Sequence, residues 1–233
     1  MVKHDFEMIN LKAGEIVIGS TKGGWMHAGE RPAHRVELTK FSISSQKIAL
    51  EEMPEKGRPP TQAEWAYARS QGVIPQLKSQ EVVVLADNAI NGHRGAPLDG
   101  RPRLSGEAML KNRYWAMVGQ KDGEARVPIR IEEMQNPQTY VVFRSLANNR
   151  SEIVPTDTDV LPNMFTEILC IFIFGVIPSF MIPIFRGFAD YAIEGWVNLL
   201  FGGLCAGFVS GIIWRPRRPI WGIENGKFTR LRS

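Results

Sequence analysis

The chain of 233 residues is poor in metal-binding and redox-active side chains. It has only two cysteines, and both lie in apolar segments. This usage excludes a disulfide framework, and we expect both to act as small hydrophobic residues. The histidines are scattered, and no two have the spacing typical of a metal site. The residues concerned are Cys170, Cys205, His4, His27, His34 and His93. The sequence therefore predicts no metal and no cofactor.

Charge is missing from two long stretches near the C-terminus. Phe165–Phe185 contains one ionisable residue, Glu167, and Trp196–Trp214 contains none. A helix that crosses a hydrocarbon core of ~30 Å needs about 20 apolar residues, so each stretch is long enough. A helical hairpin buried in a soluble core is the alternative, but both helices would be apolar on every face. We therefore predict a transmembrane hairpin. The first residues lack an apolar signal region, so the hairpin itself is expected to direct insertion.

The second apolar stretch carries a stripe of small residues. Gly203, Gly207 and Gly211 are four residues apart and share one helix face. Helix backbones approach closely along such a face in lipid, so we expect these glycines to pack against the first span or against another subunit. Pro178 and Pro183 are expected to kink the first span.

The positive charge is concentrated after the second span. The net charge is +4, and most of the excess follows residue 214, including Arg215, Arg217 and Arg218. A basic block beside a membrane span more often sets topology or contacts anionic lipid than binds nucleic acid. The short turn between the spans is acidic, because Asp190 and Glu194 outnumber one arginine. The positive-inside rule then places the C-terminus, and with two spans also the soluble domain, in the cytoplasm.

The first 150 residues have the pattern of short strands and one helix. Glu15–Ile18 is a brief apolar strand, and His34–Leu38 alternates as a half-buried strand does. Thr61 and Glu64 form a capping box that starts a helix over Gln62–Gln71. We divide the chain into a soluble domain (1–150), a linker (151–164), the hairpin (165–214, with spans 165–185 and 196–214) and a basic tail (215–233).

Three ordered blocks and a closing strand resemble the formylglycine-generating (sulfatase-modifying factor) family. The resemblance covers about residues 8–147, and a weaker echo lies between the third block and the closing strand. The first block is Gly14, Ile18, Gly19 and Ser20; the second is Glu30, Pro32, His34, Val36, Leu38, Phe41 and Ile43. The third is Arg58–Trp65 with Tyr67 and Ala68, the closing strand is Tyr140–Arg144, and the echo is Gly106, Met109, Asn112 and Trp115. The resemblance implies an α+β, loop-rich fold related to C-type lectin domains.

Two departures from the family bear on activity. Only Ser45–Gly57 bridges a gap where the family has a longer helix and loop. The enzymes of the family bind copper with a pair of cysteines late in the domain, and residues 1–150 contain no cysteine. We therefore expect a pseudoenzyme, and His34 is expected to be a structural, hydrogen-bonding residue.

The remaining candidate site is a polar loop. Asn91, His93 and Arg94 flank glycines in a loop that is a candidate for binding an anion, although such loops are more often simple turns. The leading hypothesis is a membrane-anchored, non-catalytic binding or scaffold protein that contacts lipid and either other membrane subunits or itself. The alternative is a membrane-acting effector whose domain senses a ligand and whose hairpin oligomerises.

Overall fold

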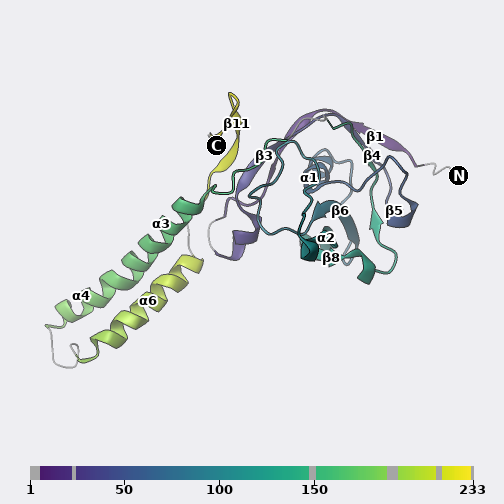
Figure 1. Ribbon diagram of the computed structural model, residues 1–233. Coiled ribbons are helices and arrows are strands. Elements are labelled where there is room, and N and C mark those ends of the chain that lie inside the picture. The colour runs from purple at the N-terminus through teal and green to yellow at the C-terminus, as the bar shows by residue number, and fades with distance from the viewer. Residues whose placement is uncertain (1–5, 23–24, 147–150, 188–193, 214–216, 232–233) are drawn as a thin grey trace.

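A computed structural model describes residues 6–22, 25–146, 151–187, 194–213 and 217–231. The fold is a mixed α+β domain from which a helical hairpin projects (Figure 1). Two small sheets contain the early strands. One joins β1, β4 and β10; the other joins β12, β11, β3 and β2 in that order. Their bounds are Met8–Leu11 (β1), Gly14–Ile18 (β2), Ala33–Leu38 (β3), Phe41–Ser44 (β4), Val142–Phe143 (β10), Ile220–Glu224 (β11) and Lys227–Leu231 (β12).

The other strands and the short helices complete the domain. A third sheet joins β6, β7 and β8 as an antiparallel meander, and β5 pairs with β9. The strands are Ile48–Ala49 (β5), Val82–Asn88 (β6), Arg113–Gln120 (β7), Gly123–Arg130 (β8) and Gln138–Thr139 (β9). The helices are Gln62–Ser70 (α1) and Ala108–Lys111 (α2), with 3-10 turns at Trp25–Glu30 (η1), Leu50–Glu52 (η2) and Ile131–Glu133 (η3).

Strand β3 has the half-buried character that its sequence pattern predicts. His34, Val36 and Leu38 are buried, whereas Arg35 and Glu37 are more exposed. Its antiparallel partner β2 begins at Gly14, one residue before the predicted strand.

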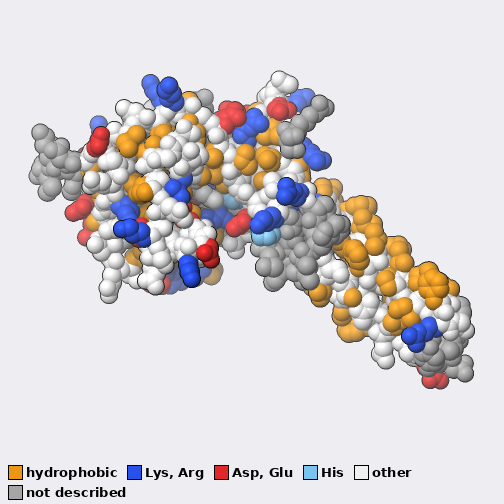
Figure 2. Space-filling model, turned by 180° about the vertical axis from the view of Figure 1, so that it is seen from behind, with side chains coloured by type: hydrophobic (Ala, Val, Ile, Leu, Met, Phe, Trp, Pro, Cys, Tyr) orange, Lys and Arg blue, Asp and Glu red, His pale blue; other side chains and the backbone are white. Residues whose placement is uncertain are grey.

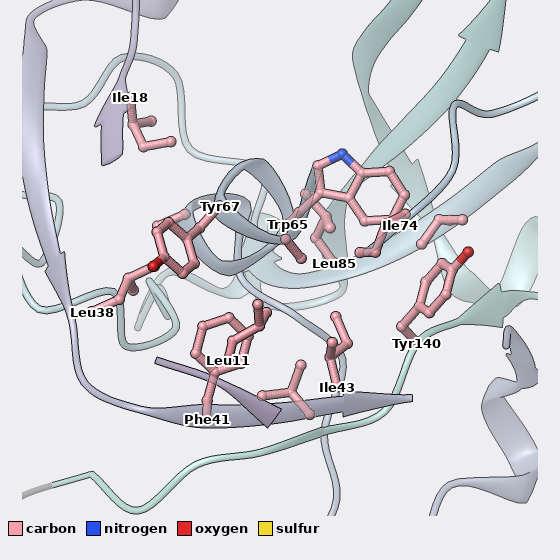
Figure 3. Packing of buried hydrophobic residues seen from close by; sticks show 14 of the residues in the cluster. Leu11, Ile18, Leu38, Phe41, Ile43, Trp65, Tyr67, Ile74, Leu85 and Tyr140 are labelled. Atoms are coloured by element: carbon pink, nitrogen blue, oxygen red, sulfur yellow. The ribbon is translucent and has the colours of Figure 1, made fainter. Parts of the chain in front are cut away.

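Helix α1 begins at the predicted capping box. The Thr61 hydroxyl accepts from the amide of Glu64, and the Glu64 carboxylate accepts from the amide of Thr61 at 2.9 Å. The helix packs over β1 and β4, where Trp65 and Tyr67 meet Phe41 and Ile43 (Figure 3). These contacts form the main hydrophobic core.

A buried ion-pair cluster ties α1 to the closing strand. The Glu64 carboxylate is fully buried and pairs with Arg58 at 2.7 Å and with Arg144 at 3.2 Å. Because removal of one partner from such a cluster leaves a buried charge uncompensated, the cluster fixes how these segments meet.

The helical hairpin has two antiparallel arms. The first arm is continuous from Val160 to Phe185 and consists of α3 (Val160–Ile171), a π-helical turn η4 (Phe172–Val176) and α4 (Ile177–Phe185). It begins five residues before the predicted span, so the expected linker is shorter than 151–164. The π-helical turn immediately precedes Pro178, whose ring nitrogen cannot donate within the helix. The second arm is α6 (Trp196–Ile213).

The segment expected to be a basic tail is a β-hairpin. Strand β11 pairs with β12, and it also pairs in parallel with β3, with Ile220 opposite Ala33 and Trp221 opposite His34. The chain therefore returns to the domain after the helical hairpin and completes a sheet that began near residue 14.

Candidate functional site

Many apolar side chains are exposed on the described parts of the two arms. Large hydrophobic side chains lie exposed along both arms, and Figure 2 shows them covering the projecting part of the molecule. Five of them, Leu161, Phe165, Phe185, Val197 and Phe201, are at least 66% exposed. Soluble monomers rarely expose an apolar surface of this size. The first arm, Val160–Phe185, is long and apolar enough to cross a membrane, and the apolar helix Trp196–Ser210 is shorter.

The two arms contact each other through glycine. A Cβ atom on Gly203 would lie 2.6 Å from the Gly175 carbonyl oxygen, and one on Gly207 would lie 2.8 Å from the Ile171 Cα. Of the two partners considered for this stripe, the first arm therefore occupies the face of Gly203 and Gly207. The surroundings of Gly211 lie outside the described residues. The sequence did not predict Gly175 as a contact residue, because the first arm has no regularly spaced glycines.

Hydrogen bonds fix the base of the hairpin to the domain. The Trp221 Nε1 donates to the Asp159 carboxylate at 3.2 Å, and the Arg31 guanidinium donates to the Asn163 side chain at 3.0 Å. Asp159 immediately precedes α3, so both ends of the hairpin are held at the same place.

The basic residues after the second arm have different environments. Arg215 lies outside the described residues, and Arg217 is exposed. Arg218, for which we expected contact with lipid or a role in topology, is 8% exposed, and its backbone amide donates to the Thr21 carbonyl at 2.7 Å. The return of the chain to the sheet places this side chain inside the folded part of the protein.

The structure separates the three residues of the predicted binding loop. Asn91 is exposed, and the Arg94 Nε donates to the Thr158 carbonyl at 2.8 Å, just before α3. His93 turns inward and is 5% exposed. The loop therefore does not present a shared anion-binding face; instead, its backbone pairs with the segment leading to α3, since Gly95 donates to Val154 and Val154 donates to Ala96.

His93 instead lines a small pocket of the domain, in which apolar and polar side chains meet. The cavity has a volume of about 40 Å³, and its walls come from β3, α1, the end of β6 and the loops that follow β6. The ring of His34 lies 5.1 Å from that of His93, and two arginines, Arg103 and Arg126, reach the same space. A second hollow of about 240 Å³ shares Gln62, His93 and Arg126 with the first. The two hollows therefore adjoin at these three residues, and we refer to them together as the cleft.

Burial controls the charge of the cavity residues. It lowers the pKa of His34 from 6.5 to about 4, and Arg103 adds to the effect, whereas the hydrogen bond to Pro32 opposes it. Burial also lowers the pKa of His93 well below its usual value, with further contributions from His34, Arg126 and Arg103. Both imidazoles are therefore neutral at neutral pH. His34 has the expected structural hydrogen bond, between Nδ1 and the Pro32 carbonyl at 3.2 Å.

The two arginines are held by neutral groups. The Arg126 guanidinium stacks on the Trp115 ring at 4.2 Å and donates to the Gln62 side chain at 2.6 Å and to the Gly29 carbonyl at 3.2 Å. The Arg103 guanidinium donates to the carbonyls of Gly92 and Arg94. Burial lowers the pKa of both arginines.

One buried carboxylate, Asp87, lies beside the cavity. It accepts from the backbone amides of Gln62 at 2.7 Å and Arg103 at 2.8 Å, and burial raises its pKa. Within the described residues, no group of three histidine, cysteine or acidic side chains is arranged to hold a metal ion. Cys170 and Cys205 both belong to the helical hairpin, so the residues of the domain do not fit the copper pair of the formylglycine-generating enzymes.

Sequence reasoning identified His93 but missed its surroundings. Arg103 and Arg126 are far apart in the chain and have no periodic or motif context. Only the fold brings them together, through β8 and the loop after β6.

The chain matches no protein-family model, no curated protein and no solved structure. The arguments for function therefore come from the geometry described above.

Proposed function

We propose that this protein is a membrane-anchored, non-catalytic binding or scaffold protein that acts as an accessory subunit of a membrane assembly. In this proposal the two arms of the hairpin cross the bilayer, and the domain lies at the cytoplasmic surface. At 1.5 Å per residue the 26-residue first arm is about 39 Å long and the 18-residue α6 about 27 Å, close to the ~30 Å of a hydrocarbon core.

One observation supports the proposal most strongly: β11 pairs with β3. The strands on both sides of the hairpin belong to one sheet, so both ends of the hairpin lie on the same side of any membrane that it enters. If the first arm crosses the bilayer, α6 must cross back. The pairing thus supports two spans even though α6 is the shorter helix.

Membrane extraction and cysteine labelling test the arrangement. The full-length protein is expected to stay with the membrane fraction in alkaline carbonate and to be released by detergent. In a Cys170→Ala/Cys205→Ala background, Ser145→Cys in the domain and Lys227→Cys in β12 should react with a membrane-impermeant maleimide only after the cells are opened. Phe185→Cys, at the far end of the first arm, should react in intact cells.

Other labelling patterns distinguish the parts of the proposal. Labelling of Ser145→Cys and Lys227→Cys on opposite sides would exclude the two-span arrangement. Labelling of both in intact cells would retain two spans and reverse the orientation. A protein that stays in the supernatant without detergent would exclude membrane anchoring altogether.

We also propose that the domain is a degenerate relative of the formylglycine-generating family with a lectin-like frame. Many residues that carry the resemblance surround one core: the first block includes residues of β2, the second includes residues of β3 and β4, and the third leads into α1. Glu64 from the third block pairs with Arg144 from the closing strand. The missing cysteine pair supports a binding role rather than catalysis. Copper or iron bound stoichiometrically to the purified protein would contradict the non-catalytic part.

The effector alternative has less support from the hairpin. Ser179 is 1% exposed, and its hydroxyl donates to the Val176 carbonyl within the first arm, so it does not contribute to a polar outer face. A pore needs such a face. Loss of membrane potential on overexpression would favour the effector.

A further inference from the structure

The cleft that contains His93 is lined by two arginines that no carboxylate in the described part of the chain contacts directly. Arg103 and Arg126 both line it, and within the described residues no carboxylate lies within 4.0 Å of either guanidinium. The nearby carboxylate, Asp87, is buried and holds two backbone amides. Two further acidic residues, Glu30 and Glu124, line the outer hollow but do not contact either guanidinium, so both arginines lack a direct carboxylate partner among the residues that the structure describes.

Unused hydrogen-bonding groups point to the same place. The Nε2 atom of His93 is buried and has no hydrogen-bond partner within the described residues. A buried polar atom without a partner destabilises the folded state, so such an atom in a cavity is a sign of a missing ligand or water. A guanidinium has five N–H donors, and two hydrogen bonds are seen for Arg126. The His93 ring and the Arg126 guanidinium therefore both have N–H groups that can donate to a ligand.

The outer part of the cleft is suited to an apolar group. Trp65, Ala66 and Met117 line it beside Arg126. Of the two acidic residues there, Glu124 already pairs with Arg69 at 3.3 Å and accepts from the amide of Leu77, and Glu30 lies at the exposed rim. The larger hollow of about 240 Å³ has the volume of about eight water molecules, which limits the ligand to a small organic molecule.

We propose that this cleft binds a small organic monoanion, namely a carboxylate with a short apolar body. The carboxylate lies between the Arg126 guanidinium and the Nε2–H of His93, and the apolar body packs on Trp65 and Met117. A charge-assisted bond to arginine is the strong interaction of such a site, and the cation compensates the charge of the ligand. The proposal rests on the binding role proposed for the domain and names the class of its ligand.

Calorimetry on the full-length protein in detergent tests the ligand class. The probes are butyrate and benzoate, their uncharged amides butyramide and benzamide, and inorganic phosphate. We expect saturable binding of a carboxylate and no binding of its amide. Equal binding of acid and amide would overturn the proposal, as would binding of phosphate alone or of none of the probes at millimolar concentration.

Variants locate the binding to this cleft. Arg126→Gln removes the cation and is expected to weaken carboxylate binding at least tenfold, because a hydrogen bond between two charged groups is stronger than one between neutral groups. Arg130→Gln is the matched control, since Arg130 lies on the same strand and is exposed, with Glu133 at 3.2 Å. Unchanged affinity in Arg126→Gln would place the ligand elsewhere and overturn the proposal.

A third variant keeps the test decisive if Arg126→Gln fails to fold. Ala66→Phe fills the outer cleft from α1 without removing a charge, and it should abolish binding of benzoate while the protein keeps its thermal stability. Retained benzoate binding in this variant would overturn the proposal. All these measurements are made in detergent, so they are independent of the extraction and labelling tests of membrane anchoring.

Discussion

At the scale of single residues, the two buried histidines make the domain sensitive to acid. His34 is 1% exposed, its ring neighbours that of His93, and the closest cation that affects it is Arg103. The folded protein keeps His34 neutral down to about pH 4, whereas the unfolded chain takes up this proton near pH 6.5. Protonation therefore favours the unfolded state, and the stability that the neutral ring contributes above pH 6.5 is lost as the pH falls to about 4.

We expect the melting temperature of the protein to fall steeply between pH 6.5 and pH 4. His34→Asn, which retains an amide to donate to the Pro32 carbonyl, should be less stable at pH 7.5 but should lose less stability on acidification. His27→Asn, a change in the partly exposed η1 turn, should leave the pH profile unchanged. Thermal unfolding in detergent at a series of pH values makes the comparison. Parallel profiles for wild type and His34→Asn would show that His34 is not the group responsible.

Local sequence identified some residues of the cavity but not the cavity itself. His34 and His93 were identifiable from the sequence, the first by its strand pattern and the second by its loop. The cavity between them was not, because Arg103 and Arg126 are brought there by contacts between distant segments. Arg94 illustrates the converse: its loop suggested a ligand, but its side chain holds the chain at Thr158.

At the scale of elements, two adjacent glycines of α6, Gly202 and Gly203, have different surroundings. Gly203 lies against the carbonyl of Gly175, whereas a Cβ on Gly202 would meet no atom of the other arm within 4 Å in the described part of the chain. One position is at the contact of the arms, and the other faces away from it.

Gly203→Leu is expected to destabilise the hairpin by about 1 to 3 kcal/mol, because the added side chain separates closely packed backbones. Gly202→Leu should change the stability by no more than about 0.5 kcal/mol. Tryptophan fluorescence during unfolding in detergent reports the effect, since Trp196 contacts Phe180 across the arms at 5.2 Å. Equal destabilisation by both substitutions would contradict the arm-to-arm packing. Loss of an oligomer in Gly202→Leu alone would place a second subunit on the outer face.

The elements that the sequence predicted are those with strong local patterns. Strands β2 and β3 and helix α1 each have alternation or a capping box within a few residues. Strand β6 was missed because it is buried on both faces from Val83 onward and so has no alternation. Strands β11 and β12 were missed because their basic residues resemble a tail and because the partner β3 lies far away in the chain.

At the scale of the whole molecule, the helical hairpin is an insertion into a domain that closes behind it. Hydrogen bonds from Trp221 to Asp159 and from Arg218 to Thr21 hold the returning chain. We therefore expect the domain to fold without the hairpin.

Replacement of residues 160–213 by a flexible Gly/Ser linker of about eight residues should give a soluble, folded domain. Truncation after residue 159 should give a less stable protein that aggregates, because β3 then becomes an open edge strand. Size-exclusion chromatography and circular dichroism of the two variants make the comparison. If the linker variant aggregates as readily as the truncation, the domain depends on the hairpin for its stability.

The late position of β11 in the sequence also determines when the sheet that contains β3 can be completed during synthesis. Strand β3 ends at residue 38, and its second neighbour in the sheet, β11, begins only at residue 220. At 5 to 20 residues per second the ribosome takes roughly 10 to 40 s to make the intervening chain. During that interval one edge of β3 is unpaired, and both apolar arms are synthesised before its partner strand. In the arrangement proposed above, the two arms enter the lipid first, and β11 then pairs with β3 and covers its open edge.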